Sequence, residues 1–286
     1  MSEQHLSPLD WARWAAPGIV WGTSFYFIAE GLEAFPAILI TPIRVALGFL
    51  TLAMFPAVRR QRVERSDWPR VLLLGTIWMA IPLSLFPFAE ETVSSSVTGM
   101  LNGATPIFVT TVAAVMARSM PSRQRLLGLA IGFAGVVLIA LPSGGGENSW
   151  GGIGLIFLAL VFYGFALNVA VPLQQKYGAL VLMWRVQLVA VCLTAPLAIP
   201  SLGDVEFTWP AMAAMIGLGS LGTAVAYVAM ADNAGRLGSS RASASVYLIP
   251  VVSLLLGAVV RGESVVALSV LGCAVALGGA YVASRR

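Results

Sequence analysis

Charged and metal-binding side chains are scarce in this sequence. Only 10 % of its 286 residues are Asp, Glu, Lys or Arg, and it has one His and two Cys, whereas a soluble domain averages about 25 % charged residues. So few charges exclude an ordinary soluble globular chain. Because His, Cys and acidic residues form no cluster, the sequence offers neither a metal site nor a nucleophile beside a base. We therefore expect no enzyme, no metal and no cofactor.

The few acidic residues also avoid the centres of the long uncharged runs. Those nearest to a run stand close to its ends, as do Glu30, Glu90, Glu91, Asp232 and Glu263. A buried acid is the usual proton relay or cation site of a membrane protein, so its absence argues against the mechanism of small-multidrug-resistance proteins and suggests facilitated movement down a gradient. Arg44 and Arg185 lie within runs, and we expect these long side chains to snorkel to a helix end or to pair.

The sequence is instead rich in long hydrophobic runs. Its residues are 58 % hydrophobic and its mean hydropathy is +0.86. The runs are roughly 20 residues long, as a hydrocarbon core of about 30 Å requires, and they lack the period-2 alternation of outer-membrane strands. They predict an all-α integral membrane protein with ten transmembrane helices, at residues 14–31, 38–58, 70–90, 94–117, 124–142, 151–172, 179–200, 209–231, 239–260 and 266–284.

The net charge of +4 is distributed as a topology signal. If the N-terminus is inside, 14 of the 17 Lys and Arg residues fall in inside segments, and the outside loops carry acids. This positive-inside bias predicts that both termini are cytoplasmic and removes the reason to expect nucleic acid as a partner. The chain has no Asn-x-Ser/Thr sequon and no cleavable signal pattern, which fits a multi-pass protein of a bacterial inner (plasma) membrane. Cys192 and Cys273 fall in mid-helix, so we expect no disulfide.

The chain also contains an internal repeat. A shift of 144 positions lays Ser95, Ser96 and Pro106 over Ser239, Ser240 and Pro250, and Leu127, Gly128 and Gly135 over Leu271, Gly272 and Gly279. The repeat divides the chain into five-helix halves, residues 1–145 and 146–286. Because five is odd, the halves have inverted topology, which is the mark of secondary transporters that work by alternating access.

These features resemble a known family. The sequence has "WG" in the first predicted helix, an Arg in the second, a Pro at the centre of the fourth and ninth, and Gly-rich fifth and tenth helices. Together they look like the EamA type of the drug/metabolite transporter (DMT) superfamily, over nearly the whole chain. Within it, the aromatic-rich helices and short loops look most like the YddG-type amino acid exporters. The resemblance implies a central cavity, export of small amphipathic metabolites and no ATP.

The fourth predicted helix carries an unusual polar stretch, "GMLNGATPIF", at residues 99–108. Thr98, Asn102 and Thr105 share one helix face, and Pro106 removes the amide that would bond the Asn102 carbonyl. We expect a free carbonyl and a polar cavity wall there. The glycines of the same stretch, Gly99 and Gly103, are better explained by close helix packing.

The ninth predicted helix repeats this arrangement, with Ser243 and Tyr247 ahead of Pro250. Its proline frees the carbonyl of Val246, and two matched kinks would serve as gates, as would Pro82 of the third helix. The two freed carbonyls would receive a substrate ammonium group. Aromatic and amide side chains at the same depth complete the predicted substrate-binding set: Trp21, Tyr26, Trp78, Phe86, Tyr163, Asn168 and Tyr227.

The sequence therefore predicts a secondary transporter that exports small amphipathic metabolites, with aromatic or broadly neutral amino acids as the leading class. Export of drugs or other metabolites by the same superfamily is an alternative. A non-transporting membrane interaction or lipid-handling protein is an alternative from another class. Small residues in the fifth and tenth helices predict a seam between the halves. We expect a monomer in the bilayer, although the same residues would also support a dimer.

Overall fold

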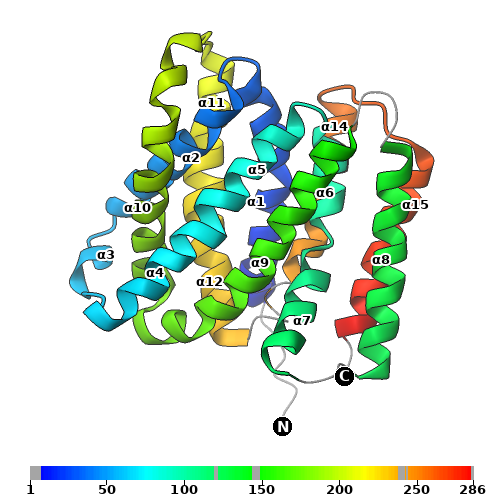
Figure 1. The fold of residues 1–286 in the computed structure, drawn as a ribbon, viewed down its shortest axis with the longest axis horizontal. Coiled ribbons are helices and arrows are strands. Elements are labelled where there is room, and N and C mark those ends of the chain that lie inside the picture. Colours follow the sequence, from blue (N-terminus) through cyan, green and yellow to red (C-terminus); the bar gives the residue numbers. More distant parts are fainter. Residues whose placement is uncertain (1–7, 119–121, 144–148, 238–241, 243, 285–286) are drawn as a thin grey trace.

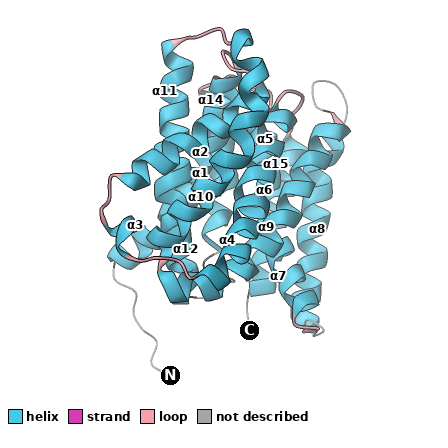
Figure 2. Cartoon of the chain, turned by 60° about the vertical axis from the view of Figure 1, so that its left-hand side comes forward, coloured by secondary structure: helices cyan, strands magenta, loops and turns pink. Residues whose placement is uncertain are grey.

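The computed structural model describes residues 8–118, 122–143, 149–237, 242 and 244–284. Every regular element that these residues form is helical (Figure 2), which confirms the all-α class. Six helical segments of this part of the chain are long and apolar enough to cross a membrane: Arg65–Glu90, Ser95–Met116, Arg123–Pro142, Trp150–Tyr177, Ala179–Asp204 and Trp209–Leu237. Shorter apolar helices accompany them.

The predicted ranges of the first half are mostly helical, and three of them are interrupted. In the 38–58 range the helix stops at Ala53 and a short helix starts at Ala57. The 70–90 range contains a π-helical turn, and the 94–117 range is broken after Asn102. The elements are α1 (Pro8–Leu32), α2 (Ala37–Ala53), α3 (Ala57–Arg60), η1 (Arg65–Asp67), α4 (Trp68–Leu74), the π-helical turn η2 (Gly75–Ala80), α5 (Ile81–Glu90), α6 (Ser95–Asn102), α7 (Thr105–Met116) and α8 (Arg123–Ser143).

The second half of the chain is built of helices as well. Its helix at 209–231 also contains a π-helical turn, and its described part of 239–260 begins as a 3-10 turn before Pro250. The elements are α9 (Trp150–Tyr177), α10 (Ala179–Ala198), η3 (Ile199–Asp204), α11 (Trp209–Gly217), the π-helical turn η4 (Leu218–Val225), α12 (Ala226–Leu237), η5 (Ala244–Leu248), α14 (Ile249–Val259) and α15 (Ala267–Ser284).

Local sequence explains where several helices begin. Ser94, Ser149 and Thr208 precede α6, α9 and α11, and each side chain accepts a hydrogen bond from a backbone N–H of the first turn. Such caps satisfy donors that have no partner within the helix. In a membrane protein this matters more, because a bare N–H at the edge of the hydrocarbon region is costly.

The outer surface is apolar, as lipid contact requires. Large hydrophobic side chains stand exposed on the outer helices, among them Phe133 on α8, Leu197 on α10 and Leu271 on α15. A contiguous apolar exterior of this kind would aggregate in water. The polar side chains of the helices are correspondingly turned inward, and seventeen polar or charged residues of the described chain are buried.

Helices of one half pack on helices of the other. α2 lies against α10, α6 against α14 and α8 against α15, while α1 contacts α11, η4, α12 and α14, and α9 contacts α5 and α7. Figure 1 shows α8 and α15 side by side along one edge of the molecule. It also shows α1 running away from the end at which α15 finishes, whereas α9 runs toward that end.

The α8–α15 contact depends on glycine. A Cβ at Gly135 would overlap the backbone of Ala276, and a Cβ at Gly279 would overlap the backbone of Gly132. The two helices therefore touch backbone to backbone, as small residues at three- and four-residue spacing permit. This is the seam that the sequence predicts between the fifth and tenth helices.

Candidate functional site

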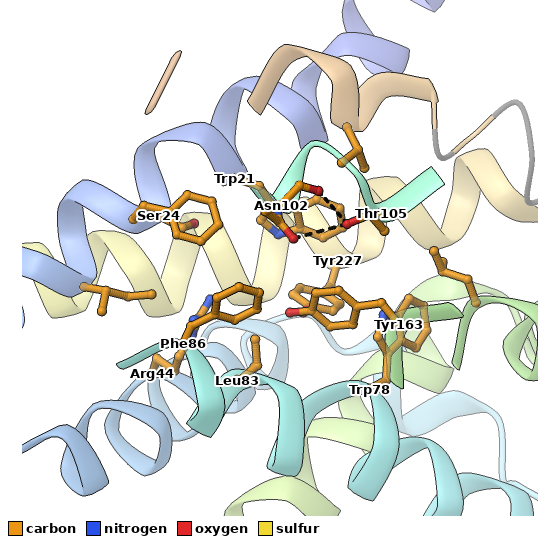
Figure 3. Close-up of a pocket in the computed structure, with 14 residues that line it drawn as sticks. Trp21, Ser24, Arg44, Trp78, Leu83, Phe86, Asn102, Thr105, Tyr163 and Tyr227 are labelled. Carbon is orange, nitrogen blue, oxygen red and sulfur yellow. Dashed lines mark hydrogen bonds between the residues drawn. The ribbon is translucent and has the colours of Figure 1, made fainter. Parts of the chain in front are cut away.

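A buried cavity lies among helices of both halves at the centre of the molecule (Figure 3). Its volume is about 40 Å³, which holds roughly three water molecules. Most of its lining residues are buried, and a much larger occupant requires the helices to move apart. The lining residues are Trp21, Ser24, Phe25, Ile28, Arg44, Trp78, Leu83, Phe86, Asn102, Thr105, Tyr163, Leu167, Tyr227 and Val246.

Aromatic rings form most of the wall. Tyr227 of α12 meets Trp21 edge-on, with ring centroids 5.0 Å apart, and meets Trp78 of η2 at 5.6 Å. Phe86 lies 6.0 Å from the ring of Tyr163, whose hydroxyl is 3.4 Å from that of Tyr227. Edge-to-face rings pack firmly while leaving hydroxyls and ring faces available. The cavity thus suits a molecule with an apolar or aromatic body.

The π-helical turn η4 supplies polar anchors beside these rings. In such a turn the backbone hydrogen bonds join residues five positions apart, and these turns are frequent at functional sites. The indole N–H of Trp21 donates to the Gly222 carbonyl at 2.9 Å, and Nε2 of Gln187 donates to the Thr223 carbonyl at 2.8 Å. Through these bonds η4 fixes one wall of the cavity to α1 and α10.

The polar stretch of α6 and α7 forms the wall opposite Arg44 in the view of Figure 3. The helix breaks between Asn102 and Thr105, as the proline predicts. The Thr105 hydroxyl then donates to the Asn102 carbonyl at 2.7 Å and lies 3.2 Å from the Asn102 side-chain oxygen. The expectation that this carbonyl is free was therefore wrong, because a neighbouring hydroxyl replaces the missing amide.

Arg44 also differs from its prediction. It is 2 % exposed, it lines the cavity, and its Nε donates to Thr223 Oγ1 at 3.1 Å. Among the described residues, no acceptor lies within hydrogen-bonding distance of its two terminal nitrogens, and no acidic residue is part of the cavity lining. Arg44 thus neither snorkels nor pairs with an acid. Arg185 does reach a helix end, donating to the carbonyls of Val58 and Gln61.

Close helix packing explains how Arg44 reaches Thr223. A Cβ at Gly219 of η4 would come within 2.9 Å of the Arg44 carbonyl, and a Cβ at Gly48 of α2 would crowd Gln187 and Thr223. These two glycines let α2 and η4 approach each other. The Thr223 hydroxyl also donates to the Leu218 carbonyl at 3.0 Å, so it is oriented to accept from the guanidinium.

Of the predicted substrate-binding set, seven residues line the cavity: Trp21, Trp78, Phe86, Asn102, Thr105, Tyr163 and Tyr227. Four others lie outside its lining. Thr98 bonds the Ser94 carbonyl, Asn168 bonds the carbonyls of Val109 and Gly164, Tyr26 packs beside Phe27, and Tyr247 is partly buried in η5. Ser243 is outside the described residues.

The three predicted kink prolines are buried at the starts of helices. Pro82 follows η2, Pro106 opens α7 and Pro250 opens α14. Gly99 and Gly103 bring α6 against α14, since added Cβ atoms would overlap Ser253 and Pro250. The glycines therefore serve packing, as the sequence suggests.

Sequence reasoning missed several lining residues. Phe25 and Val246 line the cavity in place of their neighbours Tyr26 and Tyr247, because a shift of one position turns a helical side chain by about 100°. Ser24 was also available as a polar residue in the first helix. Arg44 carried the clearest signal, an unpaired charge within an apolar run.

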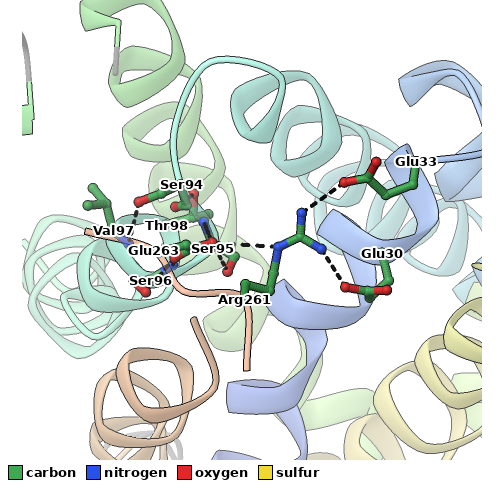
Figure 4. Close-up of polar contacts among 9 residues, drawn as sticks. All are labelled: Glu30, Glu33, Ser94, Ser95, Ser96, Val97, Thr98, Arg261 and Glu263. Atoms are coloured by element: carbon green, nitrogen blue, oxygen red, sulfur yellow. Dashed lines mark hydrogen bonds and ion pairs between the residues drawn. The ribbon is translucent and has the colours of Figure 1, made fainter. Parts of the chain in front are cut away.

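Polar clusters tie the halves together at both ends of the molecule. At one end Arg261 pairs with Glu30 at 2.5 Å and with Glu33 at 2.9 Å (Figure 4). Burial lowers the pKa of Arg261, but its bonds to Glu33 and Glu30 outweigh that effect and raise the pKa above its ordinary value. At the other end Lys176 and Tyr177 of α9 both bond the Asp67 carboxylate, at 2.7 and 2.5 Å.

Glu263 adds a second link at the Arg261 end. Its carboxylate accepts hydrogen bonds from the backbone N–H groups and hydroxyls of Ser95 and Ser96 (Figure 4). A carboxylate at the N-terminus of a helix satisfies unpaired donors and meets the positive end of the helix dipole. An acid of the second half thereby holds the first turn of α6.

Comparison with known proteins identifies this arrangement. The EamA-like transporter family matches the chain twice, over residues 14–141 and 150–285. The chain belongs to that family. As an EamA-like protein it is a transporter and not an enzyme, and it is a multi-pass protein of the inner membrane.

Named relatives of this EamA-like chain are similar along most of its length. It is 28 % identical to "Uncharacterized transporter YdfC" of Bacillus subtilis, with 91 % of this chain and 86 % of that protein covered. It is 26 % identical to the "Probable terminal-alkyne amino-acid exporter" of Streptantibioticus cattleyicolor, covering 94 % and 91 %. "Uncharacterized inner membrane transporter YedA" of Escherichia coli K12 is 25 % identical, covering 92 % and 86 %.

A solved structure shares the fold. It is titled "Crystal structure of protein", and it superposes with a TM-score of 0.69 over 97 % of both chains at 20 % sequence identity. At this identity the likeness concerns the fold alone.

Proposed function

We propose that this EamA-like transporter exports small amphipathic metabolites, with aromatic or broadly neutral amino acids as the leading class, by alternating access to the central cavity. The observation that carries the proposal is the cavity itself. It is buried between the two halves, walled by aromatic rings and supplied with a few polar groups. Small-molecule sites have this composition, and secondary transporters place them between repeats.

The proposed architecture is ten transmembrane helices in two inverted repeats, residues 1–145 and 146–286, with both termini cytoplasmic. The family matches once in each half. Contacts of α1 with α11, η4 and α12 have their counterpart in contacts of α9 with α4, η2 and α5. The opposite directions of α1 and α9 in Figure 1 agree with inversion, and the distribution of Lys and Arg favours cytoplasmic ends.

Polar links between the halves at both ends of the molecule support an alternating mechanism. The Arg261 cluster and the Asp67 cluster lie at opposite ends of the helices, and the cavity between them is small. Opening one cluster at a time would expose the cavity to one side of the membrane. The break before Pro106 and the 3-10 turn before Pro250 give two helices places to bend.

The cargo class has two supports. One relative is named as a probable amino-acid exporter, and the aromatic wall fits an aromatic or other apolar side chain. Drugs and other amphipathic metabolites of similar size remain the second candidate class, because the same rings would accept them.

The test replaces Asn102, whose side chain faces the cavity. In proteoliposomes loaded with labelled phenylalanine, Asn102→Ala should lower efflux efficiency by about tenfold, since a lost hydrogen bond is worth about 1 to 1.5 kcal/mol. Thr111→Ala is the matched control, because Thr111 is exposed on α7, lies outside the cavity lining and bonds the Ile107 carbonyl. Equal efflux by the wild type and Asn102→Ala, at equal amounts of folded protein, would contradict the proposal.

A further inference from the structure

The cavity contains a cation that no acidic side chain of the described residues pairs with directly, although Glu90 acts on it electrostatically from farther away. Arg44 is the charged side chain among the cavity-lining residues, and it is 2 % exposed. A buried charge is costly unless it is paired, and intramembrane charges are usually paired or functional. Within the described chain, its one hydrogen-bond partner is the neutral hydroxyl of Thr223.

The guanidinium is nevertheless held in a fixed orientation. Thr223 Oγ1 accepts from Nε, and the hydroxyl is itself fixed by its bond to the Leu218 carbonyl. This leaves both terminal nitrogens without an acceptor among the described residues, and Figure 3 shows the side chain entering the cavity beside Phe86 and Leu83. Nitrogens of one planar guanidinium are spaced to bind the two oxygens of a carboxylate.

We propose that Arg44 binds the carboxylate of the cargo, and that the cargo is therefore an organic carboxylate with an apolar or aromatic body. The inference rests on the proposed function, since it assumes that the cavity is the cargo site. One fixed cation balances one negative charge, so the site selects monocarboxylates over neutral amides and over amines. The rings of Trp21, Trp78 and Tyr227 enclose the body beyond the carboxylate.

Binding would also join the two halves. Arg44 belongs to α2 of the first half, and its partner Thr223 belongs to η4 of the second. A carboxylate that pairs with Arg44 lowers the cost of keeping a cation without a direct acidic partner in this buried cavity. The loaded transporter should therefore close more readily than the empty one.

The first experiment compares related ligands on the wild-type protein. Labelled phenylalanine efflux from proteoliposomes is measured against competition by 3-phenylpropionate, phenylalaninamide and phenethylamine. We expect 3-phenylpropionate to compete well, and the amide and the amine to compete at least tenfold more weakly, because a charge-assisted pair contributes about 1.5 to 3 kcal/mol. If the amide or the amine competes as strongly as the carboxylate, the role of Arg44 is overturned while transport through the cavity stands.

The second experiment changes the arginine. Arg44→Gln should bring the ratio of competition by 3-phenylpropionate to competition by phenylalaninamide close to one. Arg44→Lys should restore part of this preference, because Lys keeps the charge but cannot bind both carboxylate oxygens as the planar guanidinium does. The preference is a ratio, so a general loss of activity leaves it unchanged. Arg185→Gln is the matched control, since it removes the other arginine of the apolar runs, which bonds helix-end carbonyls away from the cavity.

Two further outcomes are decisive. If Arg44→Gln does not fold, Thr223→Val tests the same point, because it removes the acceptor that orients the guanidinium and should lower the preference. A wild-type preference in Arg44→Gln, or in Thr223→Val, overturns the inference. Failure of the wild type to move phenylalanine or to bind any of the four probes would instead overturn the proposed function together with this inference.

Discussion

Single residues of the cavity wall have both a structural and a recognition role. Trp21 is an example, because its ring contacts Tyr227 while its indole N–H donates to the Gly222 carbonyl. A buried acceptor that loses its donor costs about 1 to 3 kcal/mol.

Trp21→Phe keeps an aromatic ring and removes the donor. We expect the free energy of unfolding in detergent to fall by about 1 to 2 kcal/mol, measured by thermal unfolding followed at a far-UV helix signal. Trp11→Phe is the control, since Trp11 is 55 % exposed and exposed substitutions usually change stability by less than about 0.5 kcal/mol. Equal stability of the two variants would show that the Gly222 bond contributes nothing.

At the scale of elements, the sequence predicted where the helices lie better than which side chains they turn inward. Apolar runs and charged loops located the helical ranges, because hydrophobic length has a direct physical cause in the bilayer. The π-helical turns η2 and η4 were not predictable, since an added residue in a helical turn leaves no mark in the local composition. Each π-helical turn rotates the side chains that follow it about the helix axis. This is one reason that the inward-facing residues were predicted less well than the helical ranges.

The same limit explains particular residues. Asn102 and Thr105 were predicted because their polarity contrasts with an apolar run, whereas Phe25 and Val246 are ordinary apolar residues in ordinary positions. Arg44 was noticed but was expected to snorkel or to pair, because its true surroundings depend on how α2 packs against η4. That packing is tertiary, and it rests on Gly48 and Gly219.

The break between α6 and α7 gives a prediction at this scale. Pro106→Ala restores an N–H that can compete with the Thr105 hydroxyl for the Asn102 carbonyl and so favours a continuous helix. If bending at this break accompanies transport, efflux of phenylalanine should slow several-fold while the unfolding temperature stays equal or rises. Pro142→Ala is the control, since Pro142 lies near the end of α8, which takes no part in the cavity. Unchanged efflux in Pro106→Ala would contradict the idea that bending at this break gates the cavity.

At the scale of the whole molecule, the two halves are joined unequally. The α8–α15 seam is a contact of backbones that excludes any larger residue, whereas the ends of the cavity are tied by side-chain pairs that can separate. Backbone contacts of this kind have no rotamer freedom with which to adjust. The seam is therefore the fixed part of the molecule.

Gly279→Ala tests the seam. The added methyl group would overlap backbone atoms of Gly132 and Gly128, so we expect a loss of about 1 to 3 kcal/mol, as for overpacked cores, and a lower unfolding temperature. Gly278→Ala is a closely matched control, because an added Cβ there meets no atom within 4 Å among the described residues. Ala is a better helix former than Gly, so Gly278→Ala should keep or raise the stability, and a loss of the same size in both variants would show that the seam is not responsible.

A fixed seam has a practical consequence for watching this transporter work. Spin labels placed on the outer faces of α8 and α15 should keep one separation whatever the cargo or the side of access, because neither helix lines the cavity. They provide a constant reference distance, against which a change in the distance between α2 and α14 can be measured in the same protein. The glycines of the α8–α15 seam thereby fix two helices relative to which the other distances that change during transport can be measured.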